Sequence, residues 1–194
     1  MLGRRGENPI APLNLLADFG GGSLTCALGI MAALIERSRT GKGQIVDANM
    51  VEGAAYMGSF VYKMRDLPLW GQNRGEGWLD TGAHFYETYQ TQDGKFMAVG
   101  ALEHQFYAQL LQGLGWTEED LPQFGGDSEE MKAKLAGKFL EKTRAEWTEI
   151  FEGLDACVTP VLHKDEAHEY GHNKERGAFQ RSCRGHMDPV PAPR

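Results

Sequence analysis

The chain has 194 residues, of which 41% are hydrophobic and 24% charged, and its formal net charge is −7. This composition is that of a folded globular protein of one or two domains, and it excludes an intrinsically disordered chain. The negative charge argues against non-specific binding to nucleic acid or to anionic membranes. Cys26 and Cys157 have no paired spacing, and we expect both to be small buried residues in a reducing compartment.

The N-terminal residues carry no signal for export or for a membrane. Arg4 and Arg5 have no apolar segment directly behind them, so no secretory signal is predicted. No apolar run approaches the roughly 20 residues of a membrane-spanning helix. We therefore expect no membrane span.

The stretch from Leu13 to Gly22 is the best candidate for a chemical centre. Residues 1–12 are predicted to be a loop, and Asp18 stands just before three glycines. Apolar residues at helical spacing from Leu24 to Ile35 predict a helix that begins after the glycines and ends near Gly41. Asp18 would then cap the helix, or it would act as a general base, acid or nucleophile beside free helix amides. Asn14 lies four residues earlier, where it would share a face with Asp18.

A short strand is predicted at 44–49, followed by a helix from about Met50 to Arg65. Met50, Met57 and Met64 lie on one apolar seam of that helix, together with Ala54 and Val61. The seam suits either ordinary core packing or an adaptable surface for apolar ligands, because thioether side chains are flexible. Pro68 is expected to end the helix region, and residues 70–82 are expected to form a Gly-rich loop.

The second half of the chain predicts a mixture of strands and helices. Two strand-like runs, 84–91 and 95–102, flank an Asp-Gly pair that is typical of a hairpin. Further along the chain, the sequence predicts a helix at 104–113, a helix start at 117–120 and a helix from Ser128. It then predicts a capping box at 143–146 with its helix, a strand at 155–162, and a polar tail without elements from 181.

Two further motifs carry possible chemistry. Glu103 ends the second hairpin strand, where it would either begin a helix or serve as a catalytic or orienting carboxylate. His168 and His172 match the H-E-x-x-H zinc motif, but Gly171 and the polar surroundings favour solvated histidines. No metal site is expected.

Six segments occur in an order that is specific to one family. They are 11–22 (APLNLLADFGGG), 39–44 (RTGKGQ), 47–53 (DANMVEG), 82–86 (GAHFY), 98–103 (AVGALE) and 173–177 (NKERG). Together they resemble the class III CoA-transferase family, and within it the racemases that act on acyl-CoA thioesters. The resemblance covers roughly residues 6–180.

The resemblance implies an α/β fold with part of a Rossmann-like large domain and a smaller α+β domain. It implies inversion of the 2-methyl centre of an acyl-CoA by removal and return of the α-proton through an enolate. Asp18 matches the family's aspartate base or acid, and Asn14 matches its hydrogen-bond partner. Glu103 matches the glutamate that supports a catalytic histidine. Met50 and Tyr86 match residues that line the acyl side, and Met57 lies on the same seam.

The family's catalytic histidine lies upstream of the Asp18 motif, in a segment that these residues do not include. We therefore expect a chain that is truncated at both ends and nearly inactive alone. Two alternatives stay open: a class III CoA-transferase that uses Asp18 as its acyl-accepting nucleophile, and a non-catalytic dimerisation or regulatory fragment.

The expected organisation has four parts: a partial large domain at 1–50, a linker helix and loop at 51–81, a small α+β domain at 82–180, and a polar tail at 181–194. No cofactor is expected, because CoA is part of the substrate. The expected partners are an acyl-CoA thioester and a second copy in a homodimer, with no nucleic acid. The expected location is intracellular, in peroxisomes or mitochondria if the source is eukaryotic and in the cytoplasm if it is bacterial.

Overall fold

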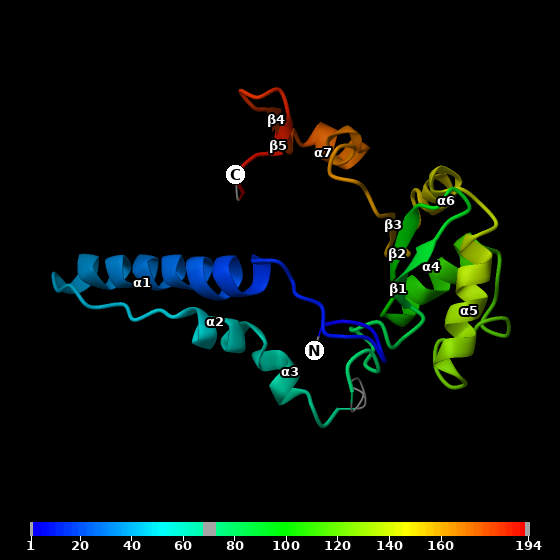
Figure 1. Ribbon diagram of the computed structural model, residues 1–194, viewed down its shortest axis with the longest axis horizontal. Helices are drawn as coiled ribbons and strands as arrows, with labels where there is room; N and C mark the ends of the chain where they lie inside the picture. The colour runs from blue at the N-terminus through cyan, green and yellow to red at the C-terminus, as the bar shows by residue number, and fades with distance from the viewer. Residues whose placement is uncertain (1, 68–72, 193–194) are drawn as a thin grey trace. The chain divides into compact units, whose positions relative to one another are not determined.

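A computed structural model describes residues 2–67 and 73–192 (Figure 1). The chain divides into two units, Met1–Glu87 and Thr88–Arg194, which are described separately. Pro68 and residues 70–72 of the expected Gly-rich loop lie outside the described residues. The four-part division expected from sequence stays a prediction.

The first unit is built on one long helix. A π-helix, η1 (Leu15–Leu24), continues directly into α1 (Thr25–Thr40). The expected helix is therefore present, but its predicted start after the glycines is wrong, because the helix begins ahead of Asp18. The wide turn starts where the Phe19 amide donates to the Asn14 carbonyl at 3.0 Å, which is the i to i−5 bond of a π-helix. Gly41, at φ 71°, ends α1.

The next segment departs from prediction twice. Residues 42–49 are irregular, so the strand expected at 44–49 is wrong. Among the described residues no strand pairs with this segment, and a strand is stable only with a neighbour to accept its hydrogen bonds. The helix expected from Met50 to Arg65 is two helices, α2 (Met50–Met57) and α3 (Ser59–Lys63), which are separated at Gly58. Asn49 caps α2 by accepting the Glu52 amide at 2.8 Å.

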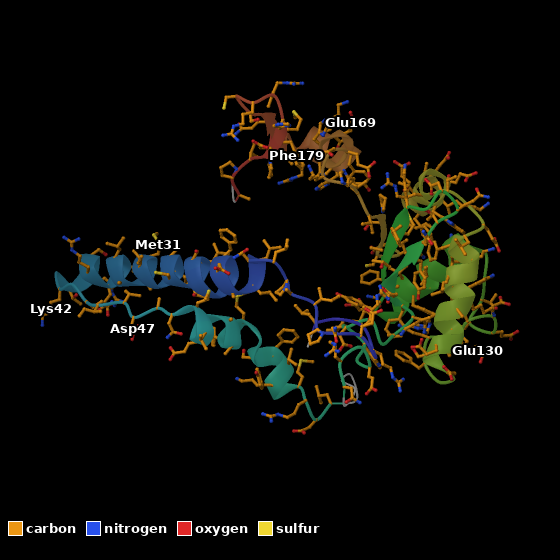
Figure 2. The ribbon with its side chains drawn as sticks, viewed as in Figure 1. Met31, Lys42, Asp47, Glu130, Glu169 and Phe179 are labelled. Atoms are coloured by element: carbon orange, nitrogen blue, oxygen red, sulfur yellow. The ribbon has the colours of Figure 1, made fainter. Side chains whose placement is uncertain are left out.

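α1 is apolar and exposed. It has no buried residue, and Figure 2 shows side chains such as Met31 projecting from it. The continuous helix Leu15–Thr40 is 26 residues long with a mean hydropathy of 1.5 in its most apolar window, so it passes a length-and-composition test for a membrane helix. The expectation that no apolar run approaches such a length was therefore wrong. Core helices of soluble proteins pass the same test, so the result does not assign a membrane span to this helix.

The second unit contains a three-stranded sheet in the order β1-β2-β3, with β1 (Tyr86–Gln90) running into this unit from the first. The hairpin predicted around Asp93 is confirmed, with β2 (Phe96–Gly100) following a turn in which Gly94 has φ 72°. β3 (Val158–Pro160) is shorter than expected and pairs antiparallel with β2, placing Val99 opposite Val158.

Three helices of the second unit form near their predicted positions: α4 (His104–Leu114), α5 (Ser128–Phe139) and α6 (Arg144–Phe151). The capping box of Thr143 and Glu146 at the start of α6 is confirmed. The helix start expected at 117–120 is wrong. Those residues form a turn, because the Asp120 carboxylate accepts the amide and hydroxyl of Thr117 at 2.9 and 3.0 Å and so closes the chain on itself.

The core of the second unit is aromatic. Phe139, which is fully buried, stacks on Tyr89 with ring centroids 5.3 Å apart and meets Trp147 at 5.2 Å. The indole of Trp147 donates to the Phe139 carbonyl at 2.9 Å. Burial of these rings, together with leucines of α4 and α5, supplies the apolar area that holds helices and sheet together.

The C-terminal segment has more structure than predicted. It contains a 3₁₀ turn, η2 (Ala167–Glu169), a short helix, α7 (Gly171–Glu175), and a hairpin of β4 (Phe179–Arg181) and β5 (Met187–Pro189). The expectation of a tail without elements was therefore wrong. Ser182 accounts for the hairpin, because its amide donates to the His186 carbonyl at 2.8 Å across a turn with Gly185 at φ 84°.

Candidate functional site

Asp18 lies in the first turn of η1 and is exposed. Asn14 occupies the N-cap position of η1, so the interpretation of Asp18 as the N-cap residue is wrong. Its side chain makes no hydrogen bond in the part of the chain that the structure describes, and only its carbonyl is engaged, by the Ser23 hydroxyl at 3.0 Å. The carboxylate is thus not held by another group, and it lies in the first turn of η1, where the helix dipole favours negative charge.

Asn14 lies at the N-cap position and is also exposed, and its side chain makes no capping hydrogen bond. Its backbone carbonyl holds the Phe19 amide. The backbone therefore fixes the residue one turn before Asp18, while the amide group is not engaged in capping the helix.

The two methionines flank the glycines that follow Asp18. Met57 is 42% exposed, and its thioether lies 2.9 Å from where a Cβ on Gly20 would stand. Met50 is 44% exposed, and its Cβ lies 3.8 Å from the corresponding point on Gly22. The structure therefore brings Met50 and Met57 beside the turn that carries Asp18.

Tyr86 begins β1 and is 37% exposed. Its neighbour Glu87 points to the opposite face of the strand, where it is 8% exposed and binds the guanidinium of Arg4 through both carboxylate oxygens. The sequence did not single out this ion pair, because the two residues are 83 positions apart. It anchors the strand that presents Tyr86.

Glu103, in the second unit, occupies the N-cap position of α4 and is exposed. Its side chain does not cap the helix, although its carbonyl accepts the amides of Phe106 and Tyr107 at 3.0 Å. The carboxylate therefore stays available for another role. Asp18, Asn14, Met50, Met57 and Tyr86 all belong to the first unit.

The negative charge of Glu103 affects the pKa of the Cys157 thiol. Desolvation of the thiol is the largest cause that raises the pKa of Cys157, followed by the negative charges of Asp155 and Glu103. The residue as a whole is exposed, so its expected burial was wrong, and Cys26 is only half-buried. Cys157 has a backbone φ of 50° and lies immediately before β3, not within the strand.

The H-E-x-x-H match does not form one helix. His168 lies in η2 and His172 in α7, with Tyr170 extended between them at ψ 131°. Among the described residues, no group of three or more His, Cys, Asp or Glu side chains is placed to hold a metal ion.

Two of the cavities in the described residues are not lined by any residue predicted for the site. One, of about 300 Å³, lies in the second unit beside Glu169 and Phe179, which Figure 2 labels. The other, of about 450 Å³, lies in the first unit beside Arg5 and Arg74. Met50 and Met57, both on α2, lie instead against the glycines of η1.

The chain carries an exposed carboxylate in a first helical turn, next to glycines that admit a second helix. It shares its fold with solved structures of low sequence identity. The chain aligns over its full length with Rv3272 from M. tuberculosis (TM-score 0.68, 17% identity, 52% of that chain). It aligns over 99% of its length with a CAIB/BAIF family protein from Brucella suis (TM-score 0.65, 16% identity, 56% of that chain).

The chain belongs to CoA-transferase family III, whose model matches residues 1–194. It is 59% identical over 99% of its length to human alpha-methylacyl-CoA racemase and 56% identical to the mouse racemase, in each case over 51% of the relative. It is 41% identical over 93% of its length to a CaiB/baiF CoA-transferase family protein of Caenorhabditis elegans. The chain therefore spans about half the length of the curated relatives it matches.

Proposed function

We propose that this chain contributes to an acyl-CoA racemase that inverts the 2-methyl centre of acyl-CoA thioesters. The observation that carries the proposal is the 59% identity to the human racemase across nearly the whole chain. The exposed Asp18 carboxylate in the first turn of η1 is in keeping with it.

In the proposed reaction Asp18 takes or returns the α-proton of the thioester. Removal of that proton puts negative charge on the thioester oxygen, and first-turn amides of η1 are donors of the kind that stabilise such an enolate. Asn14 would hold the Asp18 carboxylate by a side-chain hydrogen bond. Tyr86, Met50 and Met57 would line the acyl group.

Inversion requires a second acid–base group on the opposite face of the α-carbon, because the proton must return from the other side. Glu103 is proposed to support that group, as its carboxylate is not used for capping α4. By the resemblance to the family, we propose that this group is a histidine.

The test is α-proton exchange in deuterated water with a chirally pure 2-methylacyl-CoA. The polypeptide as it exists in its cell, with any flanking sequence, should exchange the proton and scramble the centre. Asp18→Asn should abolish both, while Asp66→Asn, which changes an exposed turn residue outside the site, should not. Full turnover by Asp18→Asn would refute the proposed role of Asp18.

A CoA-transferase reaction is the second candidate. It is favoured by the 29% identity to a succinyl-CoA–L-malate CoA-transferase subunit of Chloroflexus aurantiacus. Asp18 would then attack the thioester carbonyl, release CoA and form a mixed anhydride. Hydroxylamine would trap that anhydride as a hydroxamate at Asp18, and the absence of any trapped product during turnover would exclude this route.

The proposal extends to the surroundings of the enzyme. We propose an intracellular location, in peroxisomes or mitochondria if the source is eukaryotic, a role in fatty acid and bile acid metabolism, and assembly as a homodimer. Fluorescent tagging and sedimentation at several concentrations would test location and assembly.

A further inference from the structure

A glycine in the middle of α2 marks a close approach between two backbones. Glycine in a helix interior costs about 1 kcal/mol relative to alanine, so Gly53 needs a packing reason. A Cβ on Gly53 would overlap the Gly21 carbonyl oxygen, and a Cβ on Gly21 would overlap the backbone of Ala54. The helices η1 and α2, which run side by side in Figure 1, thus touch backbone to backbone at Gly21 and Gly53.

Thr25 holds this contact in one orientation. Its hydroxyl donates to the carbonyls of Gly21 and Gly22, the latter at 3.1 Å. The same hydroxyl lies 3.0 Å from the Cβ position of Gly53. The carbonyl that faces Gly53 is therefore fixed from both sides, and a side chain at position 53 could be admitted only by moving α2 outward.

The contact also determines how close the two methionines of α2 lie to η1. Met57 lies against Gly20, two residues after Asp18, and Met50 lies against Gly22. Because both methionines belong to α2, any outward shift of that helix would move their thioethers together away from the turn of Asp18. A Cβ on Gly20 would instead meet the flexible end of Met57 at 2.9 Å and the Leu15 carbonyl of its own helix at 3.0 Å. It would therefore displace the Met57 thioether, which yields more easily than the backbone.

We propose that Gly20 and Gly53 are specificity-determining positioning residues, which fix the gap between the Asp18 turn and the Met50–Met57 wall and so limit the acyl groups that reach Asp18. This inference rests on the proposed function. The glycines touch no substrate themselves, and they act through the positions of Met57 and α2.

The experiment is a double-mutant cycle of Gly20→Ala and Met57→Ala, made in the polypeptide as it exists in its cell. The measured quantity is the ratio of kcat/KM for a short and a long 2-methylacyl-CoA. The new Cβ meets Met57 at 2.9 Å, so Gly20→Ala should shift the ratio by about tenfold, which is the discrimination one methylene can give in an apolar pocket. In the Met57→Ala background the same substitution should shift the ratio by much less, because the contact with Met57 is gone and that with the Leu15 carbonyl, at 3.0 Å, remains.

Gly43→Ala is the matched control, because a Cβ there meets nothing within 4 Å. Gly53→Ala should also shift the ratio, and Met57→Ala should not remove that shift, since the obstacle is the Gly21 carbonyl. If the wild type turns over but Gly20→Ala lowers both substrates equally, or acts alike in both backgrounds, the inference is overturned while the proposed function stands. A wild type that exchanges no α-proton would overturn the proposed function and the inference with it.

Discussion

Arg4 and Glu87 join the first residues of the chain to the start of β1. The Arg4 guanidinium donates to both carboxylate oxygens of Glu87, one of them at 2.8 Å, and the Glu87 side chain is only 6% exposed. Two parallel hydrogen bonds to a planar guanidinium give a defined geometry that a lysine could not reproduce. The N-terminal loop is therefore fastened to the strand that carries Tyr86.

Removing Arg4 should destabilise the first unit. Arg4→Ala removes the guanidinium that binds both oxygens of the buried Glu87 carboxylate, which costs at least about 1–3 kcal/mol because the group is charged. Urea denaturation would measure the loss. Arg5→Ala is the control, because its ion pair with Glu76 is looser at 3.5 Å and more exposed, and it should change stability by less than about 1 kcal/mol. Equal effects of the two substitutions would contradict this account.

The second unit should lose stability in acid through Glu166. Its two hydrogen bonds from Arg144, at 2.6 and 2.8 Å, lower the pKa of Glu166 to about 2. Because the folded-state pKa is depressed, the stabilisation is complete above the unfolded-state pKa and is lost as pH falls from about 5 towards about 2. Urea midpoints at several pH values should fall more steeply for the wild type than for Glu166→Gln. Glu175→Gln, at an exposed position, should keep the wild-type slope.

The aromatic core should be the most sensitive part of the second unit. Phe139 is fully buried and contacts the rings of Tyr89, Trp147 and Phe151. Phe139→Ala should therefore cost about 3–5 kcal/mol, from lost burial and the cavity left behind. The adjacent Leu140 is 49% exposed, and Leu140→Ala should cost less than about 1 kcal/mol. Trp fluorescence during denaturation would report both, and a similar cost at the two positions would disprove the assignment of this core.

The 194-residue chain expressed alone should associate. The large apolar side chains that η1 and α1 expose are Leu15, Leu16, Phe19, Leu24, Leu28, Ile30, Met31, Leu34 and Ile35. A helix that is apolar all round is normally buried, and a patch of this kind marks an interaction surface. Light scattering should rise with concentration, and Leu28→Glu with Ile35→Glu should reduce it. A monodisperse wild-type monomer with a cooperative melt would contradict the prediction.

The predictions from sequence were confirmed where neighbouring residues alone determine the local structure. The capping box at Thr143 and the turn at Asp93–Gly94 formed as predicted, because each needs only neighbouring residues. It failed at 44–49 and at the tail hairpin, where strand formation depends on whether a partner lies alongside. The helix start was misplaced because glycine, expected to stand before the helix, is here within it.

The candidate site was predictable only as single residues. The family motifs point to Asp18, Asn14, Met50, Met57, Tyr86 and Glu103, and the roles of these residues stay predictions. The long-range contacts that support them, Gly21 with Gly53 and Arg4 with Glu87, involve residues far apart in the chain. A glycine inside a helix was the one local sign of the first contact, and the second left none.

The contact of Gly21 with Gly53 also has an evolutionary consequence. Neither glycine can acquire a side chain while the other backbone stays where it is, since each new Cβ would fall on main-chain atoms of the opposite helix. The residues at the two positions are therefore expected to depend on each other during evolution. A lineage that replaces either glycine must move α2 in the same step, so we expect homologues to retain both glycines or to have changed both.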